Sequence, residues 1–177
     1  MKKRVIGAVS AVVVLGAGAV VVTAQRGDAS ASSVRAGIET RSFPIPDGRS
    51  VDVSVEDIQA DTLRLVATSD RAAYLIARSS DGMECFIIRV IDDPNGEGRG
   101  CDPEEGFAER GTQTITLIQK DGTRIGGIRS YEPVRSATGD GRRLPVSRYV
   151  VPYTLEAGRS ATIELTTSDA KIEKTVP

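Results

Sequence analysis

The sequence predicts a mainly β protein: a single β-sandwich or open barrel of about 7–9 short antiparallel strands after an N-terminal hydrophobic helix. Three observations predict this fold. Short runs rich in β-branched residues recur from Phe43 onward. Gly- and Asp-containing turn signals divide these runs at intervals of about 8–12 residues. An uncharged apolar run of 20 residues, Val5–Ala24, precedes them.

The N-terminal run predicts export from the cytoplasm. Three cations, Lys2, Lys3 and Arg4, precede Val5–Ala24, and a cationic start before an apolar run is typical of an export signal. The run is also long enough to span a bilayer. Two alternatives remain open, namely a cleaved signal peptide that leaves Gln25 as the new N-terminus, and an uncleaved single-pass anchor. Both predict an extracytoplasmic domain, either secreted or anchored with its N-terminus in the cytoplasm.

The chain divides into three predicted parts. Residues 1–24 are the signal peptide or signal anchor, residues 25–42 a flexible Ser-, Ala- and Gly-rich linker, and residues 43–177 a β domain. Cys85 and Cys101 are the only cysteines, and a single pair in an oxidising compartment predicts a disulfide. A bridge across this short loop stabilises a domain by about 3 kcal/mol.

Strands and turns follow in order from residue 51. VDVSV alternates like a strand, yet Ser54-Val-Glu-Asp57 resembles a capping box, so a short helix at 55–61 is an alternative. Two runs at 72–77 and 85–91 are continuously apolar and predict the buried centre. The other expected strands lie at 112–119, 123–128, near Val134, and at 144–155, 160–167 and 170–176. Turn signals at 80–82, 120–122, 139–143, 156–158 and 168–169 divide them.

Composition excludes several classes of chemistry. The chain contains no His and two Cys, which excludes His-based catalysis and a Cys₄ or Cys₃ zinc site. Without residues 1–24, 20 Lys and Arg face 24 Asp and Glu, a net charge of −4, which argues against a nucleic-acid partner. No phosphate loop, dinucleotide fingerprint or nucleophile elbow occurs. The sequence therefore predicts a protein that is not an enzyme and holds no cofactor.

The acidic run from Asp92 to Glu105 is a weak calcium candidate. Asp93, Asn95, Glu97 and Glu104 occupy the first, third, fifth and twelfth positions of an EF-hand-like loop. Pro94 and the lack of a helical pattern in the flanking sequence favour the other interpretation, an acidic hairpin loop held by the Cys85–Cys101 bridge.

Glycines and tyrosines offer two further candidate features. Gly126 and Gly127 inside a strand pattern predict a bulge or a close backbone approach. The four tyrosines either pack inside the β domain or form a platform for carbohydrate or peptide; they are Tyr74, Tyr131, Tyr149 and Tyr153. Packing is the favoured interpretation.

Three segments together carry a family resemblance. They are RLVATSDRAAYLIARSSDGMECFII before Cys101, TITLIQKDGTRIGGI after it, and the late RRLPVSRYVVPYTLE. From about Leu63 to Glu156 the chain resembles a group of exported or membrane-anchored proteins of high-GC Gram-positive, actinobacterial-type bacteria with a two-cysteine β domain. Family members often continue with V-P-D-G-V where this chain has Arg129-Ser130-Tyr131. The resemblance implies export, the disulfide and a β fold, and it transfers no functional residues.

These features predict a non-catalytic exported protein of the cell envelope with a binding or structural role. Its partner would be an unknown envelope component, and the membrane itself through Val5–Ala24 if that run is not cleaved. One alternative is an exported carboxylate-dependent hydrolase, which needs a cleft with two acids about 5–10 Å apart. The other alternative is an extracytoplasmic sensor domain.

Overall fold

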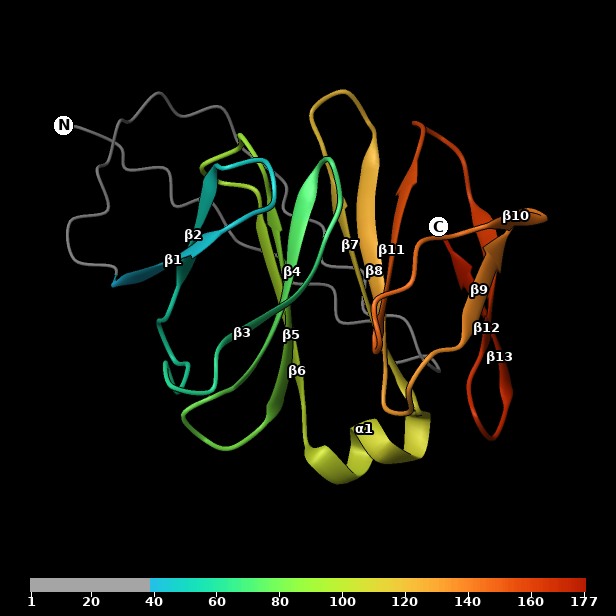
Figure 1. Ribbon diagram of the computed structural model, residues 1–177, viewed down its shortest axis with the longest axis horizontal. Coiled ribbons are helices and arrows are strands. Elements are labelled where there is room, and N and C mark those ends of the chain that lie inside the picture. The colour runs from blue at the N-terminus through green and yellow to red at the C-terminus, as the bar shows by residue number, and fades with distance from the viewer. Residues whose placement is uncertain (1–38) are drawn as a thin grey trace, which may run out of the picture.

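A computed structural model describes residues 39–177 of the chain. These residues form thirteen β-strands and one α-helix in a stack of four β layers (Figure 1). The expected N-terminal helix, the signal peptide or anchor, and residues 25–38 of the expected linker lie outside the described residues. Among residues 39–177, no helix is long and apolar enough to cross a membrane.

Four antiparallel sheets make up the layers, and none closes into a barrel. Layer 1 is the hairpin of β1 (Thr40–Pro44) and β2 (Ser50–Ser54). Layer 2 contains β3 (Arg64–Thr68), β4 (Ala72–Arg78), β5 (Glu84–Val90) and β6 (Glu97–Asp102). Layer 3 contains β7 (Thr112–Ile118), β8 (Arg124–Ser130) and β11 (Val150–Leu155). Layer 4 contains β9 (Ser136–Gly139), β10 (Arg142–Arg143), β12 (Ala161–Thr166) and β13 (Lys171–Val176).

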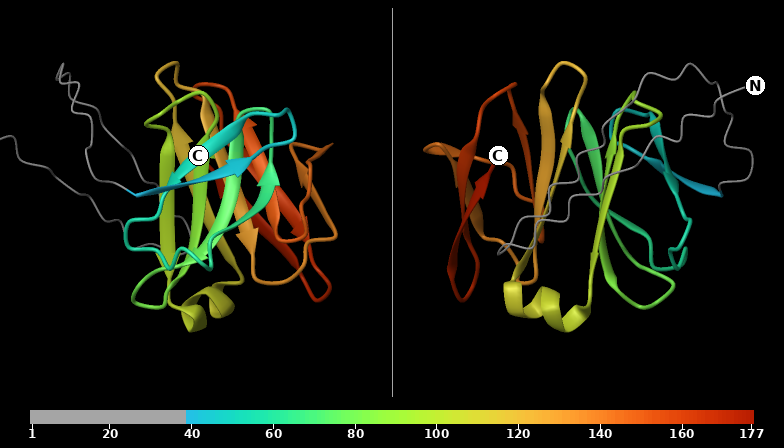
Figure 2. Two further views of the ribbon diagram at one scale, coloured as in Figure 1. Left: turned by 60° about the vertical axis from the view of Figure 1, so that its left-hand side comes forward. Right: turned by 180° about the vertical axis from the view of Figure 1, so that it is seen from behind.

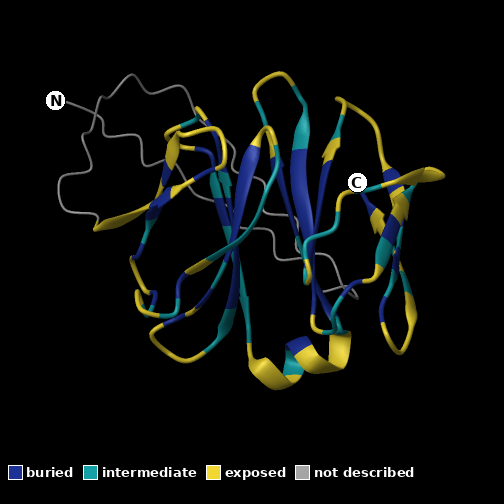
Figure 3. Ribbon diagram, in the orientation of Figure 1, coloured by how far each residue is buried: buried dark blue, intermediate teal, exposed yellow. Residues whose placement is uncertain are grey.

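Layer 2 is the buried centre, as the continuous apolar runs predict. Its strands present one face to layer 1, through residues such as Leu75 and Ile87, and the opposite face to layer 3, through Tyr74, Phe86 and Ile88. Because side chains alternate between the faces of a strand, a strand covered on both sides needs apolar residues at every position. Figure 3 shows the resulting buried ribbon through the middle of the stack.

Layer 4 packs on the far face of layer 3 and forms a third apolar interface. Ile128, Val151 and Tyr153 of layer 3 contact Ile163 and Leu165 of layer 4. The two further views show layer 4 stacked behind layer 3 and away from the β1–β2 hairpin (Figure 2). The mainly β, antiparallel prediction is therefore confirmed, whereas the expected 7–9 strands are too few because three interfaces, not one, hold the stack together.

The largest omission is β6, which has the weakly β-forming sequence EGRGCD. Its glycines serve close packing, because a Cβ built on Gly98 would lie 2.4 Å from Cδ2 of Leu117 on β7. Edge strand β6 can therefore approach layer 3 closely. At the other end of the domain, β1 begins at Thr40, so the last three residues of the expected linker belong to the fold.

The alternative of a short helix at 55–61 is wrong, and the strand pattern of VDVSV is confirmed as β2. The chain after Ser54 forms turns, and Asp57 has a left-handed φ of 58°, which a right-handed helix cannot contain. The actual helix, α1 (Glu104–Arg110), joins β6 to β7. Its sequence signals are Glu104 in the first turn, Arg110 in the last and Gly111 as the left-handed C-terminal cap.

The expected turns are confirmed between β4 and β5, β7 and β8, β11 and β12, and β12 and β13. The turn expected at 139–143 is shorter, at residues 140–141 between β9 and β10, because Arg142 and Arg143 pair with β9. The strand expected near Val134 lies at 136–139, and the one expected at 144–155 begins only at Val150.

The glycine pair in β8 makes the expected close approach. The ring of Tyr153 lies across Gly126 on the neighbouring strand, where a Cβ would come within 2.2 Å of the ring. On the opposite face, Tyr74 and Phe86 of layer 2 lie against Gly127.

Candidate functional site

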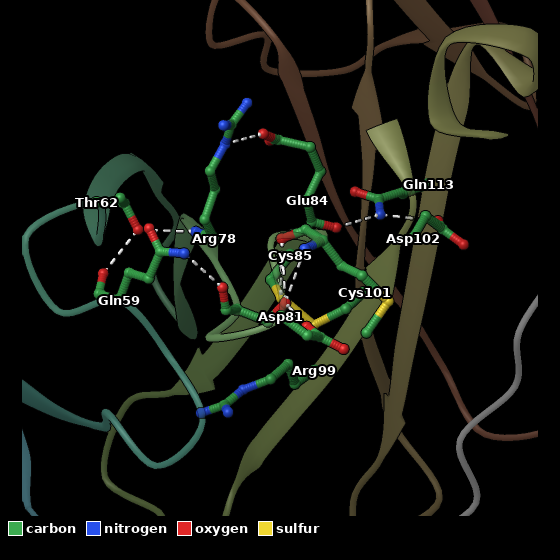
Figure 4. Close-up of a disulfide and its surroundings, with 12 residues drawn as sticks. Gln59, Thr62, Arg78, Asp81, Glu84, Cys85, Arg99, Cys101, Asp102 and Gln113 are labelled. Atoms are coloured by element: carbon green, nitrogen blue, oxygen red, sulfur yellow. Dashed lines mark hydrogen bonds and ion pairs between the residues drawn. A yellow bond between two sulfur atoms is a disulfide. The ribbon is translucent and has the colours of Figure 1, made fainter. Parts of the chain in front are cut away.

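The predicted disulfide joins Cys85 on β5 to Cys101 on β6 (Figure 4). The two residues are direct cross-strand partners in the antiparallel register. Cys85 is fully buried, and both cysteines pack into the core between layers 1 and 2. The bridge therefore fastens edge strand β6 to the central sheet.

A set of paired charges, the α1-end cluster, closes one end of the interface between layers 2 and 3. Arg129 on β8 reaches Glu84 on β5 with an N–O distance of 2.8 Å, and its guanidinium lies 4.5 Å from the ring centre of Phe107 on α1. Glu84 also pairs with Arg78 at 2.9 Å. Gln113 donates to Asp102 at 2.8 Å and to the main-chain oxygen of Glu84 at 3.0 Å. The remaining members are Glu104, paired with Arg78, and Arg110, paired with Asp102.

Electrostatics explain why Glu84 tolerates its position. Burial by itself raises the pKa of Glu84, but the hydrogen-bonded ion pairs with Arg129 and Arg78 outweigh burial, and the pKa lies below its usual value. The side chain of Arg129 is only 9% exposed. Because the charged groups of this cluster pair with one another, they hold two sheets and a helix together.

The tyrosines do not form a shared platform. Tyr74 and Tyr153 are buried, and burial raises the pKa of each to about 12. Tyr74 donates to the main-chain oxygen of Gly126, and the hydroxyl of Tyr153 lies 2.6 Å from that of Thr116. These two tyrosines are packing residues. Tyr131 is exposed and packs edge-on against Phe107, while Tyr149 is half-buried beneath Arg148.

The four calcium candidates are not brought together. Glu97 is the first residue of the six-residue strand β6 and Glu104 follows its other end, so the two are separated by about 20 Å along the strand direction. Asp93 accepts the main-chain N–H of Asn95 within a tight turn. Within residues 39–177, no group of three or more His, Cys, Asp or Glu side chains is arranged to hold a metal ion.

A wide polar groove runs between layer 1 and the exposed end of β5 and β6, with a volume of about 820 Å³. Layer 2 contributes Arg89, Glu97 and Arg99 to its wall. Strand β2 and the turn after it contribute Asp52, Ser54, Glu56 and Asp57, and the loop after β5 contributes Pro94 and Asn95. Together with Thr40, these residues form the polar groove.

The two arginines of the polar groove differ in their contacts. Arg99 donates to the main-chain oxygens of Glu56 at 2.6 Å and Ser54 at 2.8 Å, so it fixes the turn after β2. Arg99 also pairs with Glu97, which accepts the main-chain N–H of Ser54. In contrast, Nε of Arg89 is buried and has no hydrogen-bond partner in the described part of the chain. Arg89 is therefore the groove residue with unused donor capacity.

Sequence reasoning missed this groove because its walls come from segments about 40 residues apart. One signal was available, since Arg89 interrupts the otherwise apolar run from Cys85 to Ile91. A charged residue is unusual in a strand that is packed against other sheets on both faces, and it indicates a position where one of those sheets no longer covers the strand.

No protein-family model matches the chain, and no curated protein is detectably similar to it. The polar groove and the disulfide therefore carry the functional interpretation.

Proposed function

We propose that the protein is a non-catalytic component of the cell envelope, outside the cytoplasm, that binds a polar ligand in the polar groove. The observation that carries the binding role is Arg89, which lines the groove and whose side chain has no hydrogen bond or ion pair within residues 39–177. Its Nε is buried, but the side chain as a whole is half-buried, so the outer nitrogens of the guanidinium group remain accessible. A ligand oxygen that accepts from these nitrogens gains a charge-assisted hydrogen bond.

The disulfide supports the extracytoplasmic part of the proposal. Disulfides persist in oxidising compartments and are rare in the cytosol. The cationic start and apolar run at residues 1–24 agree with export, whether the run is cleaved or remains as an anchor. The resemblance to exported proteins of high-GC Gram-positive bacteria is consistent with the same location.

The chemistry of the walls narrows the ligand class. A ligand must offer an acceptor to Arg89 and donors to the carboxylates of Asp52, Glu56 and Asp57, which are exposed at the groove. Hydroxyl-rich ligands do both, because each hydroxyl group donates one hydrogen bond and accepts others. An envelope saccharide or its polyol part therefore fits the groove better than an apolar ligand does.

Co-sedimentation with isolated cell envelopes tests the binding role. The full-length protein is mixed with washed envelope fragments, and the bound fraction is measured for the wild type, for Arg89→Leu and for the control Arg159→Leu. Arg159 is exposed and lies outside the groove. Loss of a charge-assisted hydrogen bond predicts binding about tenfold weaker for Arg89→Leu and unchanged binding for the control. Equal binding by both variants and the wild type would contradict the proposal.

Alkylation of the cysteines tests the location. Because Cys85 is buried, the cells are lysed in denaturant that contains the alkylating reagent, so that burial does not hide a free thiol. The disulfide predicts no labelling of Cys85 or Cys101 without reductant and labelling of both after reduction. Labelling of both cysteines without reductant would show reduced thiols and would exclude an oxidising compartment.

A carboxylate-dependent hydrolase is the second candidate, because four acids line the polar groove. Two of them are already engaged: Asp52 accepts from Ser42, and Glu97 pairs with Arg99. Glu56 and Asp57 remain as the candidate acids. Release of soluble saccharide from the envelope fragments, abolished in the double variant Glu56→Gln/Asp57→Asn, would favour the hydrolase over the binding protein.

A further inference from the structure

A second pocket, the arginine pocket, lies on layer 4 at the opposite end of the stack from the polar groove. Its volume is about 510 Å³, and it is lined by Arg135, Arg143 and Arg148 together with apolar residues that include Val134, Leu144 and Val146. Its lining residues lie just before β9, in β10 and in the connection from β10 to β11. That connection leads from layer 4 back to layer 3 (Figure 1).

The arginines of this pocket are unpaired. None of the three has a side-chain hydrogen bond or an ion pair with any residue from 39 to 177. The only side-chain interaction recorded among them is that of Arg148, whose guanidinium lies 5.2 Å from the ring centre of Tyr149. The described residues that line the pocket include no acid. The full donor capacity of three guanidinium groups is therefore open to a ligand.

The charge of this region opposes that of the rest of the domain. Residues 39–177 contain 18 Lys and Arg against 23 Asp and Glu. Within them, residues 134–148 contain four arginines and a single acid, Asp140. Cations gathered on one surface repel one another, and an anion bound between them removes that repulsion. An acidic domain with a local positive site attracts small anions to that site specifically.

The shape of the site favours phosphate over carboxylate. Arg135 precedes β9, Arg143 belongs to β10, and Arg148 precedes β11, so the three cations come from three separate segments. A planar carboxylate suits one guanidinium fork, whereas linked tetrahedral phosphates present oxygens in several directions and can serve three forks at once. Half-buried Leu144 and Val146 form the apolar part of the pocket wall beside the three cations.

We propose that the arginine pocket binds a ligand that carries two or more linked phosphate groups. Inorganic polyphosphate and a chain of polyol phosphates share this chemistry. The inference rests on the unpaired arginines alone and does not depend on the polar groove or on the proposed function.

Calorimetric titration of the full-length protein tests the proposal in two arms, with inorganic tripolyphosphate and with a synthetic glycerol phosphate trimer. Tricarballylate, with three carboxylates, serves as the control anion. We expect binding of at least one phosphate ligand and at least tenfold weaker binding of tricarballylate. The arm with the higher affinity identifies the source of the phosphate. Equal affinity for tricarballylate, or no heat with either phosphate ligand at low salt, would overturn the proposal.

Two triple variants with the same change in net charge distinguish binding in the arginine pocket from non-specific electrostatic attraction. Arg135→Gln/Arg143→Gln/Arg148→Gln removes the three pocket cations. Arg71→Gln/Lys120→Gln/Arg159→Gln removes three exposed cations elsewhere, for the same change in net charge. We expect affinity for the bound phosphate ligand to fall at least tenfold in the first variant and less than about twofold in the second.

The triple variant Arg135→Lys/Arg143→Lys/Arg148→Lys keeps the charge but removes the guanidinium forks, so an intermediate loss is expected. Equal losses of affinity in the two glutamine variants would show that the attraction is non-specific and would overturn the proposed site. Melting temperatures of all variants accompany the titrations. Because the three arginines are exposed, we expect these temperatures to match that of the wild type.

Discussion

The α1-end cluster and the arginine pocket are both rich in arginine, yet they treat the guanidinium group in opposite ways. In the cluster, Arg129 is 9% exposed, bonded to Glu84 and stacked on Phe107. In the pocket, Arg135 and Arg143 are exposed and have no side-chain partner within residues 39–177. The comparison indicates that an arginine stabilises the fold where its N–H groups bond to other residues of the domain, and remains available to a ligand where they do not.

Replacement of Arg129 gives the largest expected effect. Arg129→Met leaves the partly buried Glu84 with Arg78 as its remaining ion-pair partner and removes the donor to Gln113 and to the main-chain oxygen of Cys85. The loss of one member of a buried pair costs about 3–5 kcal/mol. Urea denaturation measures the free energy of unfolding, with Arg135→Met as the matched control, for which we expect a change within about 0.5 kcal/mol. Equal changes in the free energy of unfolding of the two variants would contradict the proposed distinction between the two regions.

Loss of the disulfide is expected to have the next largest effect. The double variant Cys85→Ala/Cys101→Ala removes a cross-link between strands β5 and β6. For a loop of this length, the free energy of unfolding should fall by about 3 kcal/mol. The wild type in reductant should show the same loss under urea denaturation. An unchanged midpoint would mean that core packing alone holds β6 in place.

Low pH should reduce the contribution of the α1-end cluster to the free energy of unfolding and leave the contribution of the arginine pocket unchanged. Since the pKa of Glu84 is lower in the folded protein than its usual value of 4.5, its contribution to stability is present above pH 4.5 and is lost as the pH falls below it. Unfolding curves from pH 6 to pH 3 measure this loss. The variant Glu84→Gln should show a shallower decline in that range, whereas the glutamine variant of the arginine pocket should follow the wild type. A decline of unchanged slope in Glu84→Gln would assign the acid sensitivity to other groups.

The smallest effect is expected for Tyr153→Phe, which lies in neither region. The variant removes one hydroxyl and leaves that of Thr116 without its buried partner, at a cost of about 1 kcal/mol. Thermal unfolding measures the change. The triple variant of the arginine pocket should cost less than this, and a larger cost would place those arginines among the residues that hold the fold.

The sequence predicted those features that depend on local patterns. Continuous apolar runs located the centre of layer 2, turn residues located the hairpins, and the single cysteine pair located the disulfide. It failed where tertiary packing overrides local preference. Strand β6 has a glycine at position 98 because Leu117 occupies the space that a side chain would need there. The turn after Ser54 is held by Arg99, which binds the main-chain oxygens of Ser54 and Glu56.

The candidate sites were beyond sequence reasoning for the same reason. The polar groove is formed by residues of β2, β5 and β6, which are distant in the sequence. That Nε of Arg89 has no hydrogen-bond partner becomes visible only once these strands are packed together. The arginines at 135, 143 and 148 were visible as residues, but only the structure gathers them around one pocket and shows that no acid lines it.

The most direct test of the account is a paired measurement on the glutamine variant of the arginine pocket: affinity for tripolyphosphate or the glycerol phosphate trimer, and the free energy of unfolding of the same sample. The account predicts an affinity at least tenfold below that of the wild type with an unfolding free energy within about 0.5 kcal/mol of it. Unchanged affinity, or a variant that loses stability as Arg129→Met does, would contradict the claim that unpaired arginines mark binding and paired ones mark architecture.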